Sequence, residues 1–173
     1  MLEKFIASIR NNNNALTAGD IGFKYVIKVL TDAHRSDVIF DMNNRFDVPG
    51  YGYQIAAGAT ALTESWQALP TVSNNHFMLG HIMEWFYEGL AGIGQIPGST
   101  GYKHIRISPK VVGDCNAASA NYESVHGMIS SAWKLEKKHF ELTLQIPANT
   151  DAEVVLPTSV HATIYQNGNI IKP

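Results

Sequence analysis

The chain has 173 residues, of which 45% are hydrophobic, 10% aromatic and 16% charged. This composition supplies enough apolar side chain for a core and too little charge for a disordered chain, so we expect one ordinary domain or two small ones. The formal net charge of -2 offers no basic surface to nucleic acid or anionic lipid. No stretch of about 18 apolar residues suits a membrane span. We therefore expect a soluble protein with neither nucleic acid nor a membrane as a partner.

Motifs that bind metals or cofactors do not occur in the sequence. The single cysteine, Cys115, has no disulfide partner within the chain, and no spacing of cysteines and histidines matches a structural zinc site. There is no carboxylate-rich loop with calcium-ligand spacing and no glycine-rich nucleotide-binding motif. The sequence thus predicts no metal and no other cofactor.

The first half of the chain, up to Gly92, has helical periodicity. Helices are predicted over residues 20–31, 36–46, 59–69 and 75–90. Thr17 and Asp20 fit a capping box ahead of the first helix, Pro70 ends the third, and Gly92 is a natural end for the fourth. Residues 49–52, Pro-Gly-Tyr-Gly, have turn chemistry. Because these helices are apolar on several faces, they indicate an arc of a larger helical array rather than a finished bundle.

After about residue 95 the pattern changes to an alternation of apolar and polar residues, which is typical of half-buried strands. Strands are predicted over residues 104–108, 126–136, 140–146, 154–156 and 162–165, with a hairpin at 166–170. An antiparallel β-sandwich is the economical fold for this spacing. The sequence therefore predicts an α+β protein with helices over residues 1–94 and a sandwich over residues 95–173.

One carboxylate stands out as a candidate for chemistry. Glu64 is preceded by the small residues 56–60, Ala-Ala-Gly-Ala-Thr, and followed by Trp66. Small residues let a backbone approach a ligand closely, and a Trp beside a carboxylate can combine stacking with hydrogen bonding at a sugar site. An exposed helix glutamate is the alternative interpretation. Asn75 and His76 either cap the next helix or direct polar groups into a pocket.

Two segments resemble a known enzyme family. Residues 58–66 read Gly-Ala-Thr-Ala-Leu-Thr-Glu-Ser-Trp, and residues 75–93 read Asn-His-Phe-Met-Leu-Gly-His-Ile-Met-Glu-Trp-Phe-Tyr-Glu-Gly-Leu-Ala-Gly-Ile. Both are similar to the C-terminal part of the catalytic domain of bacterial α-L-rhamnosidases, inverting glycosidases with an (α/α)6 six-hairpin barrel. Residues 16–19 and 51–53 also resemble that domain. Residues 101–109, 127–133 and 146–150 resemble the β-sandwich domain that follows the barrel in that family.

The resemblance implies a fold and a set of residue roles. The fold is a helical arc of an incomplete six-hairpin barrel over residues 1–94, followed by an antiparallel β-sandwich over residues 95–173. Glu64 takes the position of the general base, and His76 that of a sugar contact. Three further residues are implied around the glycone: Tyr51, Trp66 and Asn75. Tyr51 is either a stacking face for the sugar or a hydrophobic plug under the loop.

The sequence departs from the family pattern at two positions, Ala61 for a second Thr and Thr63 for the usual Trp. An inverting glycosidase also needs a second carboxyl group ~6.5–9.5 Å from the base, and in the family that general acid lies upstream of the segment present here. We therefore expect the C-terminal portion of an α-L-rhamnosidase-like glycoside hydrolase, inactive in isolation. Its expected partners are a rhamnose-containing glycoside or polysaccharide and the missing N-terminal part of the same protein. The compartment, cytoplasmic, periplasmic or secreted, depends on that missing part.

Two alternatives remain open at this stage. One is a non-catalytic carbohydrate-binding or interaction module, in which the sandwich presents Trp133, Tyr122 or Tyr165 to a glycan, although alternating strands usually bury such aromatics. The other is a six-hairpin glycosidase with a different sugar specificity, because a fold does not fix its substrate.

Overall fold

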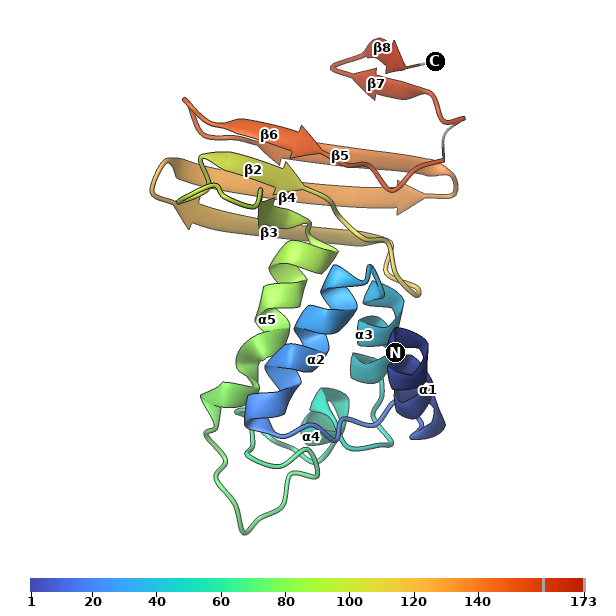
Figure 1. Ribbon diagram of the computed structural model, residues 1–173, viewed down its shortest axis with the longest axis vertical. Coiled ribbons are helices and arrows are strands. Elements are labelled where there is room, and N and C mark those ends of the chain that lie inside the picture. The colour runs from blue at the N-terminus through green and yellow to red at the C-terminus, as the bar shows by residue number, and fades with distance from the viewer. Residues whose placement is uncertain (160, 173) are drawn as a thin grey trace.

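The computed structural model describes residues 1–159 and 161–172, and it places the helices at one end and the sheets at the other (Figure 1). The α+β class is therefore confirmed. The helical segments are α1 (Leu2–Asn11), α2 (Asp20–Asp32), α3 (Ser36–Asn43), α4 (Tyr51–Ala56), η1 (Phe77–His81), α5 (Ile82–Trp85) and η2 (Phe86–Leu90). The last three follow one another directly as 3₁₀, α and π turns, so residues 77–90 form one helical rod. Within the described residues, no helix has the length and apolarity needed to cross a membrane.

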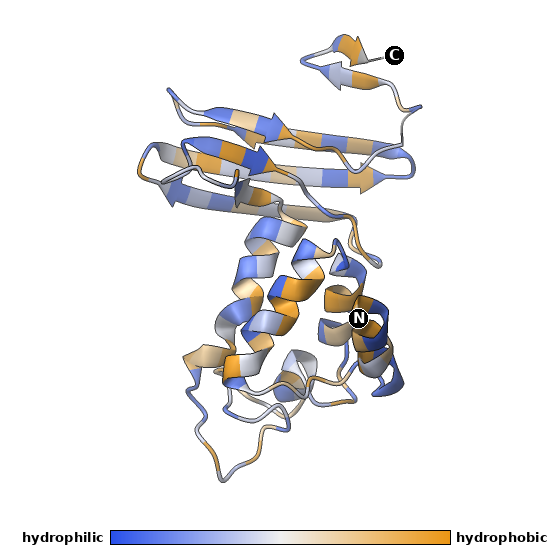
Figure 2. Cartoon of the chain, viewed as in Figure 1, coloured by the Kyte–Doolittle hydropathy of each residue, from blue (hydrophilic) through white to orange (hydrophobic). Residues whose placement is uncertain are grey.

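The core of the helical part lies between α2, α3 and the rod. Helix α2 supplies Phe23, Ile27 and Leu30, which are buried at spacings of four and three residues. The opposite side of the same helix carries Ile21, Tyr25 and Val29, which are exposed. In Figure 2, hydrophobic and hydrophilic segments alternate along α2. Helix α2 is therefore apolar on two sides, of which this chain covers one.

The predicted helix over residues 59–69 is wrong, because the segment is a loop. Left-handed backbone at Gly58 and Ala68, with φ of 84° and 51°, lies at its two ends. Inside it the Thr63 hydroxyl donates to the Ser65 carbonyl, and the Ser65 hydroxyl accepts from the Leu69 amide. Serine and threonine side chains that bond nearby backbone compete with helix formation. Apolar spacing alone did not reveal this competition.

Other helix boundaries also differ from prediction. Helix α1 was not predicted, although Leu2, Phe5, Ile6 and Ile9 have helical spacing, and α4 begins at Tyr51 inside the predicted turn. The capping box is wrong: α2 has Gly19 as its N-cap and no side-chain capping bond. The second predicted helix ends early, at Asn43, and the fourth begins at Phe77.

The second half forms two three-stranded sheets and a hairpin. Their strand orders are β1-β2-β6, β3-β4-β5 and β7-β8. The strands are β1 (Ile93–Gln95), β2 (His104–Ile107), β3 (Ala117–Ser124), β4 (Gly127–Glu136), β5 (His139–Gln145), β6 (Asp151–Val154), β7 (Ile164–Gln166) and β8 (Asn169–Lys172). The pairing of β2 with β6 is parallel, whereas all the other pairings within the described residues are antiparallel.

The two larger sheets pack face to face, as Figure 1 shows. Four isoleucines form the center of this core: Ile93, Ile105, Ile107 and Ile129. The predicted strands over residues 104–108, 126–136 and 140–146 are confirmed by β2, β4 and β5, and the predicted hairpin by β7 and β8. Strand β3 was not predicted because its sequence, AASANYES, has few residues with high strand propensity.

The helical part and the sandwich are joined by hydrogen bonds at the end of the rod. From β4, the Trp133 indole nitrogen donates to the Leu90 carbonyl at 2.8 Å, and the Ser131 hydroxyl donates to the Ala91 carbonyl at 2.7 Å. Gly92 then turns the chain into β1 with φ of 80°, a conformation that favours glycine. Gly92 thus ends the rod, as predicted.

Candidate active site

Glu64 lies on the long loop over residues 57–76, which projects from the end of the helical part farthest from the sheets (Figure 1). Gln54 of α4, which is 3% exposed, forms hydrogen bonds with the backbone of this loop. Its amide nitrogen donates to the Ser65 carbonyl at 3.2 Å, and its amide oxygen accepts from the Thr63 backbone at 3.4 Å. One buried side chain therefore fixes the backbone on both sides of Glu64.

The Glu64 side chain is exposed and hydrogen-bonded to the opposite arm of the loop. Its backbone N–H donates to the Ser73 carbonyl at 2.8 Å, and its carboxylate Oε2 accepts from the Ser73 N–H at 3.1 Å. Within the described part of the chain, no lysine, arginine or histidine forms an ion pair with it. The Glu64 carboxylate is therefore exposed and accepts a hydrogen bond from the backbone of its own loop.

His76 is the last residue of the same loop and contacts the loop itself, η1 and α2. Its backbone N–H donates to the Leu62 carbonyl at 2.7 Å, two residues before Glu64, and its carbonyl accepts from the Leu79 N–H at 3.3 Å. Its ring Nε2 lies 3.4 Å from the Asp20 carboxylate at the start of α2. Glu64 and His76 thus lie on the same long loop, which contacts α2 through His76 and Asp20.

Trp66 and Tyr51 are placed in the core beneath this loop. With Phe23 they form an edge-to-face cluster, in which the Trp66 ring centroid lies 5.0 Å from Phe23 and 5.1 Å from Tyr51. The Trp66 indole N–H donates to the Ala18 carbonyl at 2.6 Å, and the Tyr51 hydroxyl donates to the Leu79 carbonyl. Burial raises the pKa of the Tyr51 phenol well above its ordinary value. Both rings support the loop from inside.

Asn75 is exposed next to His76, and its backbone N–H donates to the Ser73 hydroxyl at 3.2 Å. Sequence reasoning missed three other residues of this region. Thr63 and Gln54 are buried polar residues under the loop, and Asp20 faces His76. Asp20 was considered only as a helix cap, and Gln54 had no distinguishing pattern. A single buried amide gives no periodic signal.

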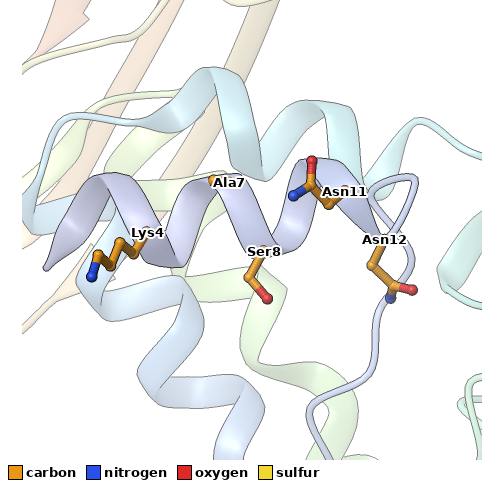
Figure 3. A pocket seen from close by; sticks show the side chains of 5 residues that line it. All are labelled: Lys4, Ala7, Ser8, Asn11 and Asn12. Atoms are coloured by element: carbon orange, nitrogen blue, oxygen red, sulfur yellow. The ribbon is translucent and has the colours of Figure 1, made fainter.

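Two surface hollows lie away from these residues. One, of about 480 Å³, lies along α1, where Figure 3 shows its lining side chains: Lys4, Ala7, Ser8, Asn11 and Asn12. The other, of about 430 Å³, lies over β3, β4 and β5. Neither contains a predicted site residue. On their loop, Glu64 is exposed and His76 is half-buried.

The aromatic residues of the binding-module alternative have different surroundings. Trp133 is 3% exposed and stacks on Phe140 with ring centroids 5.8 Å apart, so it belongs to the core. Tyr122 packs against Tyr102 at 4.6 Å, whereas Tyr165 is exposed on the terminal hairpin. Trp133 and Tyr122 lie on the paired strands β4 and β3, whereas Tyr165 lies on the separate β7-β8 sheet.

Comparison with known proteins identifies the family. The family model of the bacterial alpha-L-rhamnosidase 6 hairpin glycosidase domain matches residues 1–90, and that of the bacterial alpha-L-rhamnosidase C-terminal domain matches residues 92–170. An α-L-rhamnosidase of Streptomyces avermitilis is 32% identical over 164 residues, which are 90% of this chain and 16% of that protein. One from Formosa agariphila is 29% identical over 165 residues, which are 90% of this chain and 18% of that protein.

Solved structures agree with this comparison. The structure of α-L-rhamnosidase from Dictyoglumus thermophilum has a TM-score of 0.92 at 29% identity, covering 99% of this chain and 20% of that one. The structure of the Streptomyces avermitilis enzyme complexed with L-rhamnose has a TM-score of 0.82 at 32% identity, covering 88% of this chain and 16% of that one. The chain therefore spans a fifth or less of the length of these relatives. Because the six-hairpin model matches more than half of its residues, the chain belongs to the bacterial α-L-rhamnosidase family, as a C-terminal portion that joins part of the six-hairpin domain to the C-terminal domain.

Proposed function

We propose that this chain is the C-terminal portion of an inverting α-L-rhamnosidase and that Glu64 is its general base. The observation that carries the proposal is that Glu64 and His76 occupy one loop, where the carboxylate is exposed and free of cationic partners among the described residues. Relatives that are 32% and 29% identical to this chain are named α-L-rhamnosidases, and one was solved in complex with L-rhamnose. The substrate class is accordingly a glycoside or polysaccharide with terminal α-L-rhamnose.

In the proposed reaction, Glu64 takes a proton from a water molecule as the water oxygen attacks the anomeric carbon of the sugar. The bond to the aglycone oxygen breaks on the opposite face, and a general acid gives that oxygen a proton. The two carboxyl groups of an inverting enzyme stand ~6.5–9.5 Å apart to leave room for the water. We place the general acid in the part of the protein N-terminal to this chain, so the isolated chain has negligible activity.

The other site residues have supporting roles in this proposal. His76 and Asn75 contact the sugar from the end of the loop, since both lie at its second arm. Trp66 and Tyr51 form the floor under the loop and keep it in place by packing on Phe23. This assignment favours the hydrophobic-plug interpretation of Tyr51, because its hydroxyl already donates to the Leu79 carbonyl.

We further propose that the rest of the six-hairpin domain covers the outer side of α2. Ile21, Tyr25 and Val29 are exposed at four-residue spacing on that side, and the relatives have about five times the length of this chain. We also propose a helical domain over residues 1–94 and a sandwich domain over residues 95–173; β1 spans this boundary, and its Ile93 packs in the sandwich core. Val160 and Pro173 of the second domain lie outside the described residues.

The test uses the full-length protein that contains this chain and an aryl α-L-rhamnoside, with release of the aryl group as the readout. Glu64→Gln is expected to lower kcat by ~10²–10⁴-fold, the usual contribution of a general base. In Glu64→Ala, added azide is expected to restore turnover, because an anion needs no base to become nucleophilic. The azide then replaces water, and the product is a rhamnosyl azide with inverted anomeric configuration.

Glu84→Ala is the matched control, because Glu84 is also an exposed glutamate of the helical part but lies on α5. It is expected to leave turnover within a few fold of the unmodified enzyme. Hydrolysis that survives Glu64→Gln, or azide rescue that retains the anomeric configuration, would contradict the assignment of Glu64. Activity toward other aryl glycosides but not the rhamnoside would instead support a six-hairpin glycosidase of different specificity.

A further inference from the structure

Asp20 is the first residue of α2, and its two carboxylate oxygens have different partners. Oδ1 accepts from the backbone N–H of Ile21 at 2.8 Å, and Oδ2 lies 3.4 Å from Nε2 of His76. The first contact fixes the orientation of the carboxylate at the helix start. The second joins two side chains 56 positions apart in the sequence. Both are only partly exposed, 39% for Asp20 and 20% for His76.

This contact favours one of the two ring nitrogens as the position of the proton on a neutral histidine. An ionised carboxylate only accepts hydrogen bonds, so Nε2 must be the donor in the pair. In the neutral imidazole the other nitrogen, Nδ1, is then an acceptor with a free lone pair. The backbone of His76 is held by Leu62 and Leu79, which restricts how far the ring can move away from Asp20.

We propose that Asp20 is a positioning residue that holds His76 with its proton on Nε2, so that Nδ1 accepts a hydrogen bond from a sugar hydroxyl. The inference rests on the proposed function, in which His76 contacts the glycone. It adds a residue that no sequence motif indicated and states the chemistry of the contact. His76 recognises a hydroxyl donor of the sugar, and Asp20 prevents the ring from presenting an N–H to it.

The first measurement is made on the 173-residue chain by ¹⁵N-edited NMR of the histidine side chains. In the unmodified chain, His76 is expected to show a protonated Nε2 and an unprotonated Nδ1 at neutral pH, with the Nε2 proton shifted downfield and slow to exchange with water. Asp20→Ala is expected to abolish this slow exchange. Asp32→Ala is the matched control, because Asp32 lies at the other end of α2 and pairs with Lys28.

A proton on Nδ1 of His76 in the unmodified chain, or a doubly protonated ring at neutral pH, would overturn the proposal without any variant. Unchanged exchange of the Nε2 proton in Asp20→Ala would overturn it as well. The NMR readout involves no hydrolysis. The result for Asp20 therefore stands whether or not Glu64 proves to be the base.

The second measurement follows aryl rhamnoside hydrolysis in the full-length protein. Asp20→Ala is expected to raise KM about 10-fold, the effect of one hydrogen bond to the sugar, with kcat within a few fold. Asp32→Ala is expected to change neither parameter. An unchanged KM in Asp20→Ala would refute a role in sugar recognition. Glu64→Gln lowers kcat instead, so the two assignments fail independently.

Discussion

At the scale of single residues, the loop that carries Glu64 depends on buried polar side chains. Gln54 and Thr63 are buried, and each uses its side chain to hold loop backbone. Buried polar groups persist in native structures when they are hydrogen-bonded, and removal of one partner leaves the other group unsatisfied. Gln54 and Thr63 thus fix the loop backbone around Glu64, the proposed general base.

The first residue-scale prediction concerns Gln54. Replacing Gln54 with alanine removes both hydrogen bonds of its side-chain amide and leaves the buried Thr63 N–H without this acceptor. The free energy of unfolding is therefore expected to fall by ~1–3 kcal/mol. Urea unfolding of the 173-residue chain measures this loss. Gln67→Ala is the control, because Gln67 is exposed on the same loop and its replacement is expected to stay within ~0.5 kcal/mol. Equal losses in the two variants would mean that the Gln54 hydrogen bonds do not stabilise the loop.

The sequence identified Glu64 and His76 as candidates because they stand in a recognisable motif. The role of Gln54 could not be predicted from the sequence, because its hydrogen bonds to Thr63 and Ser65 form only in the folded chain. The pairing of Asp20 with His76 was equally invisible, since these residues are separated by α2, α3, α4 and a loop. Trp66 was expected beside the sugar, and its indole is instead bonded to the Ala18 carbonyl inside the core.

At the scale of elements, long apolar stretches were easier to predict than short ones. The rod over residues 77–90 and strands β2, β4 and β5 followed from periodicity. The loop over residues 57–76 did not, because its hydroxyl side chains compete for the same backbone groups that a helix would use. The parallel pairing of β2 with β6 is set by long-range packing, which alternation along a strand cannot reveal.

Gly92 provides an element-scale prediction. Both Gly92 and Gly98 have left-handed backbone, with φ of 80° and 86°, but a Cβ at Gly92 would lie 2.2 Å from the Pro109 nitrogen, whereas Gly98 has open space. Gly98→Ala is expected to cost ~1–2 kcal/mol from backbone strain alone. Gly92→Ala adds a clash and is expected to cost roughly 1–3 kcal/mol more. Thermal or urea unfolding of both variants measures the difference, and equal costs would show that Pro109 moves away freely.

At the scale of the whole molecule, the proposed cover over the outer side of α2 predicts a difference in stability effects between this chain and the full-length protein. Tyr25 is 63% exposed here, so Tyr25→Glu is expected to change the stability of the 173-residue chain by no more than ~0.5 kcal/mol. In the full-length protein the same change would bury a charge against neighbouring helices and is expected to cost roughly 2–5 kcal/mol.

Denaturant unfolding of both proteins, with and without the substitution, measures this contrast. Lys24→Glu serves as the control on the same helix, because Lys24 is already charged and exposed. A Tyr25→Glu effect that is equally small in the full-length protein would show that the rest of the six-hairpin domain does not cover this side of α2.

The junction between rod and sandwich has a consequence for the order of folding. A helix leaves its last carbonyls without partners within the helix. Here those of Leu90 and Ala91 receive hydrogen bonds from Trp133 and Ser131, which follow 43 and 40 positions later. The sandwich is therefore the C-terminal cap of the helix that begins beside His76. During synthesis from the N-terminus, the carbonyls at the C-terminal end of that helix receive these hydrogen bonds only after β4 has emerged, so the helical part completes its last contacts after much of the sandwich has been made.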